Sequence, residues 1–252
     1  MSSKIYLSVV IPSYNELVNL QKGVLDKVEH FLDKKKFLYE VLVVDDGSVD
    51  GSIEFVEAFV KDNAKFRLIK NQHTGKAGAV TKGMLEAKGA YVLFTDMDQA
   101  TPIEELNKLL PFFDEGFDIV IGSRSTKRKG APWTRRIMGR GMMVFRDLIV
   151  GIKGISDTQC GFKAFRSDVA QTLFSRLNSL HNGFQSISGS AVTAGFDVEL
   201  LFLAQKAKYK IKEVPVNWLY VETRRVSPVR DSIDGLIDLL RIKMSDLSGK
   251  YK

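Results

Sequence analysis

The sequence lacks the features that mark several classes of protein. Its single cysteine, Cys160, excludes a disulfide framework and a zinc site built on cysteines. No apolar run reaches the roughly 18 residues needed to cross a bilayer. The N-terminus enters an apolar strand pattern without the separate apolar block of a signal peptide. We therefore expect a globular protein of the cytosol.

Acidic residues are scarce in the second half of the chain. Residues 1–122 carry 14 Lys/Arg and 19 Asp/Glu, a net charge of −5, whereas residues 123–252 carry 23 and 11, a net charge of +12. This asymmetry predicts an acidic half that binds a cation and a basic half that meets an anion. Nucleic acid, a lipid phosphate and an anionic membrane surface all fit the charge alone.

Short apolar runs alternate with helical patterns in the first half. Strands are expected at residues 7–11, 41–44, 66–69, 91–94 and 118–121, with helices at 15–32, 52–61, 77–87 and 101–113. The last helix is expected to start at a capping box, Thr101 to Glu104, with Pro102 at its first position. This alternation predicts an α/β fold, with a parallel sheet covered by helices on both faces.

The second half is less regular. We expect helices at 133–150, 167–177, 196–206 and 232–247, a loop and strand at 157–165, an extended segment at 211–218 and a Gly/Ser-rich loop at 181–195. The helix at 232–247 is amphipathic. Because no linker or repeat interrupts the chain, residues 1–252 are expected to form one domain.

Carboxylates follow three of the predicted strands, and ligands of open α/β sheets bind at such strand ends. Asp96 and Asp98 stand two residues apart in a turn, so both can reach one hard cation, such as Mg²⁺ or Mn²⁺, that also takes diphosphate oxygens. The alternative is that acidic turn residues only cap helices. For Asp46 alone, the two interpretations are equally good.

The motifs VVIPSYNE, VVDDGS, GKAGAV, FTDMD and IGSR, in this order, resemble those of the family-2 glycosyltransferases. The later SDTQCGFKAF, FDVELL and VPVNW resemble more narrowly the dolichyl-phosphate β-glucosyltransferases and other polyprenyl-phosphate glycosyltransferases. The resemblance extends from Leu7 to about Leu247. It implies the Rossmann-like GT-A fold, with a nucleotide-sugar-binding half at 1–122 and an acceptor- and membrane-facing half at 123–252.

The resemblance also implies a donor site. Pro12, Tyr14 and Glu16 would line the nucleobase pocket, and Asp46 would contact the base or ribose. A metal site would adjoin it. Its residues come from the FTDMD motif.

In that motif, Asp98 would be the main metal ligand and Asp96 would hold the metal or the ribose, while Met97 would contact the nucleotide through its backbone. Lys76 and Arg225 would meet the donor diphosphate. A solvated lysine is an equal alternative for Lys76.

A basic segment supplies the implied acceptor site. From Arg124 to Arg146 the chain has eight basic residues and no acidic one, with large apolar residues between them. This mixture suits the interface between lipid headgroups and acyl chains, although a solvated basic helix would look similar. Arg124, Arg135, Arg136 and Arg140 would bind the acceptor phosphate.

The SDTQCGFKAF motif lies next to the acceptor in the family. Asp157 would orient the phosphate or act as a base, and a loop-capping aspartate is the alternative. Cys160 is expected to be a small buried residue, because the sequence shows no histidine partner for a nucleophile. Asp197 and Glu199 either face the site or cap a helix. The three histidines receive no role.

These implications converge on one activity. We expect inverting, metal-dependent transfer of glucose from UDP-glucose to a polyprenyl (dolichyl-type) phosphate, by a peripheral protein on the cytosolic face of a membrane. Alternatives are another donor, GDP-mannose or UDP-N-acetylglucosamine, or another acceptor. A different class is a non-catalytic module that binds a nucleotide sugar or nucleic acid, but no RNA-binding motif or helix-turn-helix pattern supports nucleic acid. The oligomeric state is not predicted.

Overall fold

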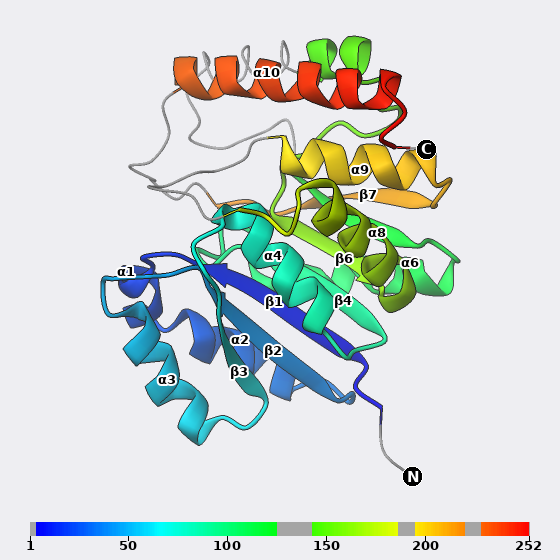
Figure 1. The fold of residues 1–252 in the computed structure, drawn as a ribbon. Coiled ribbons are helices and arrows are strands. Elements are labelled where there is room, and N and C mark those ends of the chain that lie inside the picture. Colours follow the sequence, from blue (N-terminus) through cyan, green and yellow to red (C-terminus); the bar gives the residue numbers. More distant parts are fainter. Residues whose placement is uncertain (1–3, 125–142, 186–194, 220–227, 252) are drawn as a thin grey trace.

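The computed structural model describes residues 4–124, 143–185, 195–219 and 228–251. Helices and strands alternate along these ranges (Figure 1). The strands are β1 (Leu7–Ser13), β2 (Tyr39–Asp45), β3 (Phe66–Lys70), β4 (Tyr91–Thr95), β5 (Ile119–Arg124), β6 (Phe162–Arg166) and β7 (Ile211–Val216). The helices are α1 (Leu17–Gln21), α2 (Val24–Asp33), α3 (Ser52–Asp62), α4 (Gly75–Glu86), α5 (Leu106–Leu109), α6 (Pro111–Asp114), α8 (Ser167–Leu180), α9 (Phe196–Lys206) and α10 (Pro228–Leu247), with a 3₁₀ turn at Ile103–Glu105. Residues 143–149 are also helical.

Seven strands of the described residues form one mixed sheet in the order β3-β2-β1-β4-β6-β5-β7. Strand β6 is antiparallel to its neighbours β4 and β5, and every other adjacent pair is parallel. The expected α/β class, a mostly parallel sheet flanked by helices, is confirmed. The alternation in the first half predicted parallel strands alone, and the second half adds the antiparallel one.

Apolar side chains alternate between the two faces of the sheet. In β1, Val10 packs into a core shared with α4, α8 and α9, whereas Val9 and Ile11 pack into a second core with α1, α2 and α5. Burial on both faces explains why the central strands are almost wholly apolar. The last residues of β1, β2 and β4 are Ser13, Asp45 and Thr95, which are polar and belong to neither core.

The predicted helix at 15–32 is two helices. Gly23 separates α1 from α2 and has a φ of 73°, in the left-handed region that glycine adopts without steric cost. The apolar spacing continued across this break, so periodicity alone could not reveal it.

The predicted helix at 101–113 is also divided, into the 3₁₀ turn, α5 and α6. Pro102 has a ψ of 144° and precedes the first turn instead of opening it. The Thr101 hydroxyl contacts Cys160 Sγ at 3.8 Å rather than capping a helix. Pro111 begins α6, because it lacks the amide hydrogen that would continue the preceding turn.

The remaining predictions for the second half agree with the described elements. The strand expected at 157–165 is β6, the helices at 167–177 and 196–206 are α8 and α9, and the extended segment at 211–218 contains β7. The amphipathic helix at 232–247 is α10, which begins four residues earlier. Most of the helix expected at 133–150 and of the loop at 181–195 lies outside the described residues. No described helix is both long and apolar enough to cross a membrane.

Gly83 allows α4 to lie close against the sheet. A methyl group at Gly83 would clash with Val10 and would lie 2.8 Å from Val44 Cγ2. We predict that Gly83→Ala destabilises the protein by about 1–3 kcal/mol, although alanine favours a helix by about 1 kcal/mol over glycine. Urea unfolding measures the change, and Lys82→Ala, at an exposed neighbouring position, should alter stability by less than about 0.5 kcal/mol. A Gly83→Ala protein as stable as the parent would contradict this packing.

Candidate active site

Polar residues gather where β4 and β5 end and β6 begins. Thr95, the last residue of β4, pairs with Phe162, the first of β6, so Asp96 and Gly161 become neighbours. A side chain at Gly161 would clash with the Asp96 carboxylate. The carboxylate therefore packs directly against the backbone of the segment that precedes β6, and this contact requires glycine.

Lys76 pairs with Asp96 from the first turn of α4. Its Nζ lies 2.6 Å from Asp96 Oδ1, and its side chain is 28% exposed. Burial disfavours the ammonium charge, but Asp96 and Asp197 more than offset this and raise the pKa of Lys76. Lys76 is thus a charged residue of the site and not a solvated lysine. Its contact with a donor diphosphate stays a prediction.

Asp96 and Asp98 lie on one tight turn, as the FTDMD motif predicted. Asp98 Oδ1 accepts the backbone N–H of Ala100 at 3.0 Å, and Gln99 between them has a left-handed φ of 49°. Burial and then the neighbouring Asp96 raise the pKa of Asp98. The backbone of Met97 joins the two carboxylates, while its side chain is buried in the core.

The chemistry of this turn fits a divalent cation. Two carboxylates close enough to raise the pKa of one of them form a place where added positive charge is stabilising. Among the described residues, no group of three or more His, Cys, Asp and Glu side chains could hold a metal ion. A cation held by Asp96 and Asp98 would therefore need water or substrate oxygens to complete its coordination.

Asp46 forms hydrogen bonds with the loop that leads into α4. Its carboxylate accepts the backbone N–H groups of Thr74 and Gly75 at 2.9 and 2.8 Å and the Asn71 side-chain amide at 2.9 Å, and Asp46 is only 2% exposed. The capping interpretation therefore describes what Asp46 does in this structure. Its predicted contact with a base or ribose stays a prediction.

His73 is part of this region, although the sequence gave it no role. Its ring stacks on Tyr14 with the centroids 4.2 Å apart, and its Nδ1 lies 2.8 Å from Asp46 Oδ2. Pro12 lies near the end of β1 beside β2, and Glu16 precedes α1 and accepts the Asn19 side-chain amide at 2.5 Å. The three residues predicted to line a nucleobase pocket thus lie at or directly after the end of β1, and Tyr14 among them stacks on His73, which follows β3.

Arg124 and Asp157 form a two-pronged ion pair. Arg124 Nε and Nη2 donate to the two carboxylate oxygens at 2.7 Å each, and the Arg124 backbone N–H donates to Oδ2 at 2.9 Å. Burial alone would raise the pKa of Asp157, but Arg124 reverses the effect and lowers it. A carboxylate with a lowered pKa and both oxygens engaged is a poor proton acceptor. The geometry therefore favours the orienting role predicted for Asp157 over the role of base.

The loop that carries Asp157 is itself held in place. Glu213 on β7 accepts the backbone N–H groups of Ser156 and Asp157 at 2.9 and 2.7 Å, and the Ser156 hydroxyl at 2.7 Å. Strand β7 is parallel to β5, with Val216 paired to Arg124. Neighbouring strands therefore position the two partners of the Arg124–Asp157 pair.

A buried ion pair lies beneath these groups. Lys163 on β6 is fully buried, and its Nζ donates to Asp197 Oδ1 at 2.5 Å and to the Cys160 carbonyl at 2.6 Å. Asp197 also raises the pKa of both Lys76 and Arg124. Of the two acidic residues in the FDVELL motif, Asp197 therefore faces the site.

Glu199 has a different place. It accepts the Tyr251 hydroxyl at 2.5 Å and contacts His181 Nε2 at 2.7 Å, away from the other charged groups of the site.

Cys160 is 1% exposed, and burial raises the pKa of its thiol to about 11. It is the small buried residue that was expected, and a thiol with such a pKa is not a nucleophile near neutral pH.

Four predicted site residues lie outside the described residues: Arg135, Arg136, Arg140 and Arg225.

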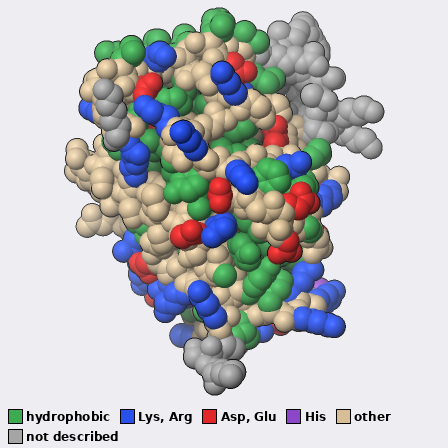
Figure 2. All heavy atoms as spheres, turned by 90° about the vertical axis from the view of Figure 1, so that its right-hand side faces the viewer, with side chains coloured by type: hydrophobic (Ala, Val, Ile, Leu, Met, Phe, Trp, Pro, Cys, Tyr) green, Lys and Arg blue, Asp and Glu red, His purple; other side chains and the backbone are tan. Residues whose placement is uncertain are grey.

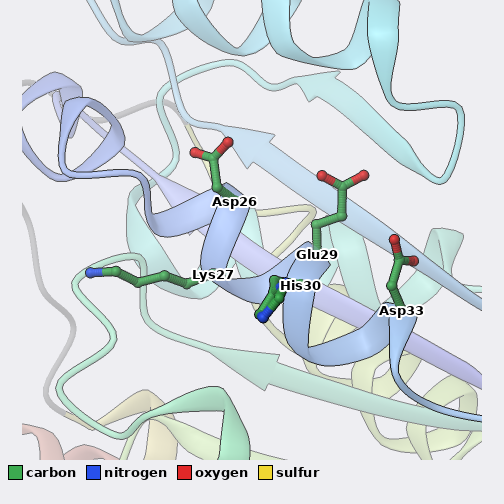
Figure 3. A pocket seen from close by; sticks show the side chains of 5 residues that line it. All are labelled: Asp26, Lys27, Glu29, His30 and Asp33. Atoms are coloured by element: carbon green, nitrogen blue, oxygen red, sulfur yellow. The ribbon is translucent and has the colours of Figure 1, made fainter.

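A separate depression lies on the outer side of α2, lined by Asp26, Lys27, Glu29, His30 and Asp33 (Figure 3). In that view Asp26 and Lys27 point to different sides of one helix, so the lining residues do not converge on a common point. The converging groups are those at the ends of β4 and β5.

Comparison with known proteins identifies the family of the chain. Residues 8–174 match the family described as Glycosyl transferase family 2. The chain belongs to this family. It is a glycosyltransferase, so the alternative of a non-catalytic binding module is wrong.

This glycosyltransferase is similar to several proteins named dolichyl-phosphate beta-glucosyltransferase. The one from Dictyostelium discoideum is 35% identical over 268 residues, covering 98% of this chain and 77% of the relative. Those from Saccharomyces cerevisiae and Homo sapiens are each 34% identical, covering 99% and 98% of this chain and 77% of each relative. The resemblance inferred from the motifs is confirmed at the level of the family and of these relatives.

Solved structures show the fold. Mannosyl-3-phosphoglycerate synthase from Rubrobacter xylanophilus has a TM-score of 0.69 at 16% identity, covering 97% of this chain and 75% of that chain. Glucosyl-3-phosphoglycerate synthase from Mycobacterium tuberculosis, solved with Mn²⁺, UDP and glucosyl-3-phosphoglycerate, has a TM-score of 0.59 at 17% identity, covering 98% and 80%. The predicted GT-A fold is confirmed.

The contact between Gly161 and Asp96 can be tested in this glycosyltransferase. We predict that Gly161→Ala lowers transfer about 10²-fold, because the new methyl group displaces Asp96 from Lys76 while the fold persists. Steady-state transfer and thermal unfolding are measured together. Gly116→Ala is the control: its φ of 83° strains alanine, but open space surrounds it, so stability should fall with activity per folded molecule unchanged. Full activity in Gly161→Ala would refute the contact.

Proposed function

We propose that this glycosyltransferase transfers glucose from UDP-glucose to a polyprenyl (dolichyl-type) phosphate, with inversion at the sugar and with Mg²⁺ or Mn²⁺ bound. The observation that carries the proposal is the presence of two cation–carboxylate pairs, Lys76–Asp96 and Arg124–Asp157, at one edge of the sheet. Two partly buried cations on different elements suit a reaction in which both substrates are phosphate esters. The names of the relatives support glucose and dolichyl phosphate.

On the donor side, Asp96 and Asp98 would hold the divalent cation. Such a cation, when bound, neutralises the diphosphate and stabilises it as a leaving group. Lys76 adds a fixed positive charge next to the same turn, at the start of α4. Tyr14, His73 and the end of β1 offer the stacked aromatic surface near which we place the base.

On the acceptor side, Arg124 would bind the lipid phosphate through its guanidinium, which forms paired hydrogen bonds to phosphate oxygens. A phosphate monoester has a second pKa near 6, so much of it is already a dianion at neutral pH. A strong general base is then unnecessary, which agrees with the lowered pKa of Asp157. Asp157 would orient Arg124, and the site would act by aligning the two substrates.

The basic run in the sequence extends the acceptor side. We propose that Arg135, Arg136 and Arg140 assist Arg124 in attracting the acceptor phosphate, that Arg225 contacts the donor diphosphate, and that the protein binds peripherally to the cytosolic face of a membrane. The halves 1–122 and 123–252 would then serve donor and acceptor within one domain.

The remaining alternatives concern substrates. GDP-mannose and UDP-N-acetylglucosamine are rival donors, and another phosphorylated acceptor is possible in the same geometry. The names of the relatives, dolichyl-phosphate beta-glucosyltransferase, favour glucose over mannose and N-acetylglucosamine.

The test is a transfer assay with purified protein, each divalent cation, the three nucleotide sugars and a short polyprenyl phosphate, with products identified by mass. We predict glucose transfer from UDP-glucose with either cation, and a loss of about 10²–10³-fold in Asp98→Asn, which removes an ionised metal ligand. Asp118→Asn lies directly before β5, at the opposite end of the strands from the site, and should retain activity. Transfer from another donor instead would overturn the assignment of UDP-glucose, and an active Asp98→Asn would overturn the metal site.

A second prediction separates donor binding from acceptor binding. Arg124→Gln should lower lipid-dependent transfer by about 10²–10³-fold while the dissociation constant for UDP-glucose changes only a few-fold, because Lys76 and the Asp96–Asp98 turn lie on other elements. Titration calorimetry and the transfer assay are run on the same preparation. Arg166→Gln, an exposed arginine at the other end of β6, is the matched control. Equal losses of donor affinity and transfer in Arg124→Gln would assign Arg124 to the donor diphosphate.

A further inference from the structure

Helix α10 presents its more apolar side to the outside. We call the outward set the α10 stripe: Ile233, Leu236, Ile237, Leu240, Met244 and Leu247. These side chains are between 38% and 76% exposed, whereas only Leu239 and Ile242 of this helix are buried large aliphatic residues of the described core. A helix on the surface of a globular protein normally faces the core with its apolar side. This orientation is reversed in α10.

The spacing makes the α10 stripe continuous. Its members recur every three or four residues and so lie along one line on the helix surface, over about 21 Å at 1.5 Å per residue. Arg241 and Lys243 flank this line together with Asp234, and Arg241, whose side chain is 74% exposed, also pairs with Asp238 of the same helix. Cations beside an apolar line can extend their head groups into water or onto phosphates while their stems rest on apolar surface.

A second exposed apolar group lies at the same end of the molecule. The helical residues 143–149 expose Val144, Phe145 and Leu148 by 57%, 53% and 76%. In Figure 1 residues 143–149 and α10 are both at the top, and in Figure 2, turned by 90°, hydrophobic side chains gather along that same end. Exposed apolar side chains that gather on one side of a protein mark an interaction surface.

The helical residues 143–149 contact the loop on the proposed acceptor side of the site. Arg146, which follows Phe145, is 4% exposed, and its guanidinium donates to the Ile155 carbonyl at 2.6 Å and to the Thr158 hydroxyl at 3.4 Å. Thr158 is next to Asp157, the partner of Arg124. The exposed apolar residues therefore belong to an element that contacts the loop of the Arg124–Asp157 pair.

We propose that the α10 stripe, together with Val144, Phe145 and Leu148, docks on the interfacial region of a phospholipid bilayer, with α10 lying in the membrane plane. This inference rests on the proposed function, because it names the surface that would bring the site to a lipid phosphate. A lipid surface matches the chemistry better than a second copy of the chain. The stripe is only one helix wide, Arg241 and Lys243 lie beside it, and residues 125–142, which precede the helical residues 143–149 in the sequence, carry six basic residues and no acidic one.

The first experiment measures sedimentation of the full chain with vesicles of phosphatidylcholine and of equimolar phosphatidylcholine and phosphatidylserine. Leu240→Ser/Met244→Ser should weaken partitioning to both vesicles at least about tenfold, because apolar burial drives this contact. The matched control is Val18→Ser/Leu38→Ser, which changes two exposed apolar residues elsewhere and should partition like the parent. Thermal unfolding should be unaffected in both variants. Equal partitioning of parent and Leu240→Ser/Met244→Ser would overturn the proposal.

A second measurement does not depend on a loss of binding. Cys160 is buried, so Met244→Cys places one accessible thiol on the stripe for an environment-sensitive fluorophore, and Val18→Cys is its control. Vesicles should shift the emission of the label at position 244 to the blue and leave that at position 18 unchanged. A shift at 244 that follows protein concentration without vesicles, with a dimer in light scattering, would show that a second copy covers the stripe and would overturn the proposal.

Transfer assays keep this inference distinct from the proposed function. Leu240→Ser/Met244→Ser should transfer to a short, water-soluble polyprenyl phosphate within about twofold of the parent, but should lose at least about tenfold on a long-chain acceptor embedded in vesicles. An inactive parent with every acceptor would refute the proposed function, while the vesicle measurements would still decide the docking surface. Equal losses on soluble and embedded acceptors would show that the stripe acts on the site and not on the membrane.

Discussion

The antiparallel placement of β6 between β4 and β5 is the constraint on which the site depends. Because β6 starts at the edge where its neighbours end, the chain before it runs past Asp96 and Arg124. That segment supplies Gly161, against which Asp96 packs, and Asp157, which receives Arg124. A wholly parallel sheet would have begun this strand at the opposite edge and left both residues without these contacts.

Charge is balanced in pairs around this edge. Lys76, Arg124 and Lys163 are each opposed by a carboxylate, and Asp197 acts on all three through its bond to Lys163 and its effect on the other two. Desolvated charges are costly without partners, so removing one member of a pair would leave the other uncompensated. On the proposed function, a phosphate-bearing substrate would compete with carboxylates of the protein for Lys76 and Arg124. Each substrate would have to bring enough negative charge to replace them.

The sequence predicted the groups that topology alone places and missed those that depend on tertiary contacts. Asp96 and Asp98 could be located because a parallel strand delivers its following turn to the binding edge. Lys163 could not, since its partner Asp197 stands 34 residues away and only the packing of α9 on β6 joins them. His73 was missed because a lone histidine has no spacing pattern, and the capping by Asp46 could not be separated from ligand binding. The break at Gly23 left the apolar period intact.

The burial of Cys160 gives the molecule a built-in reporter of local opening. The thiol lies one residue before Gly161 and three after Asp157, is 1% exposed, and has a pKa raised to about 11 by that burial. A thiol reagent can therefore modify the native protein only while this segment is displaced. The rate of modification would measure how often the residues that contact Asp96 and Arg124 move out of their native positions. Substrates that hold those residues in their native positions would then slow modification of the Cys160 thiol without contacting it.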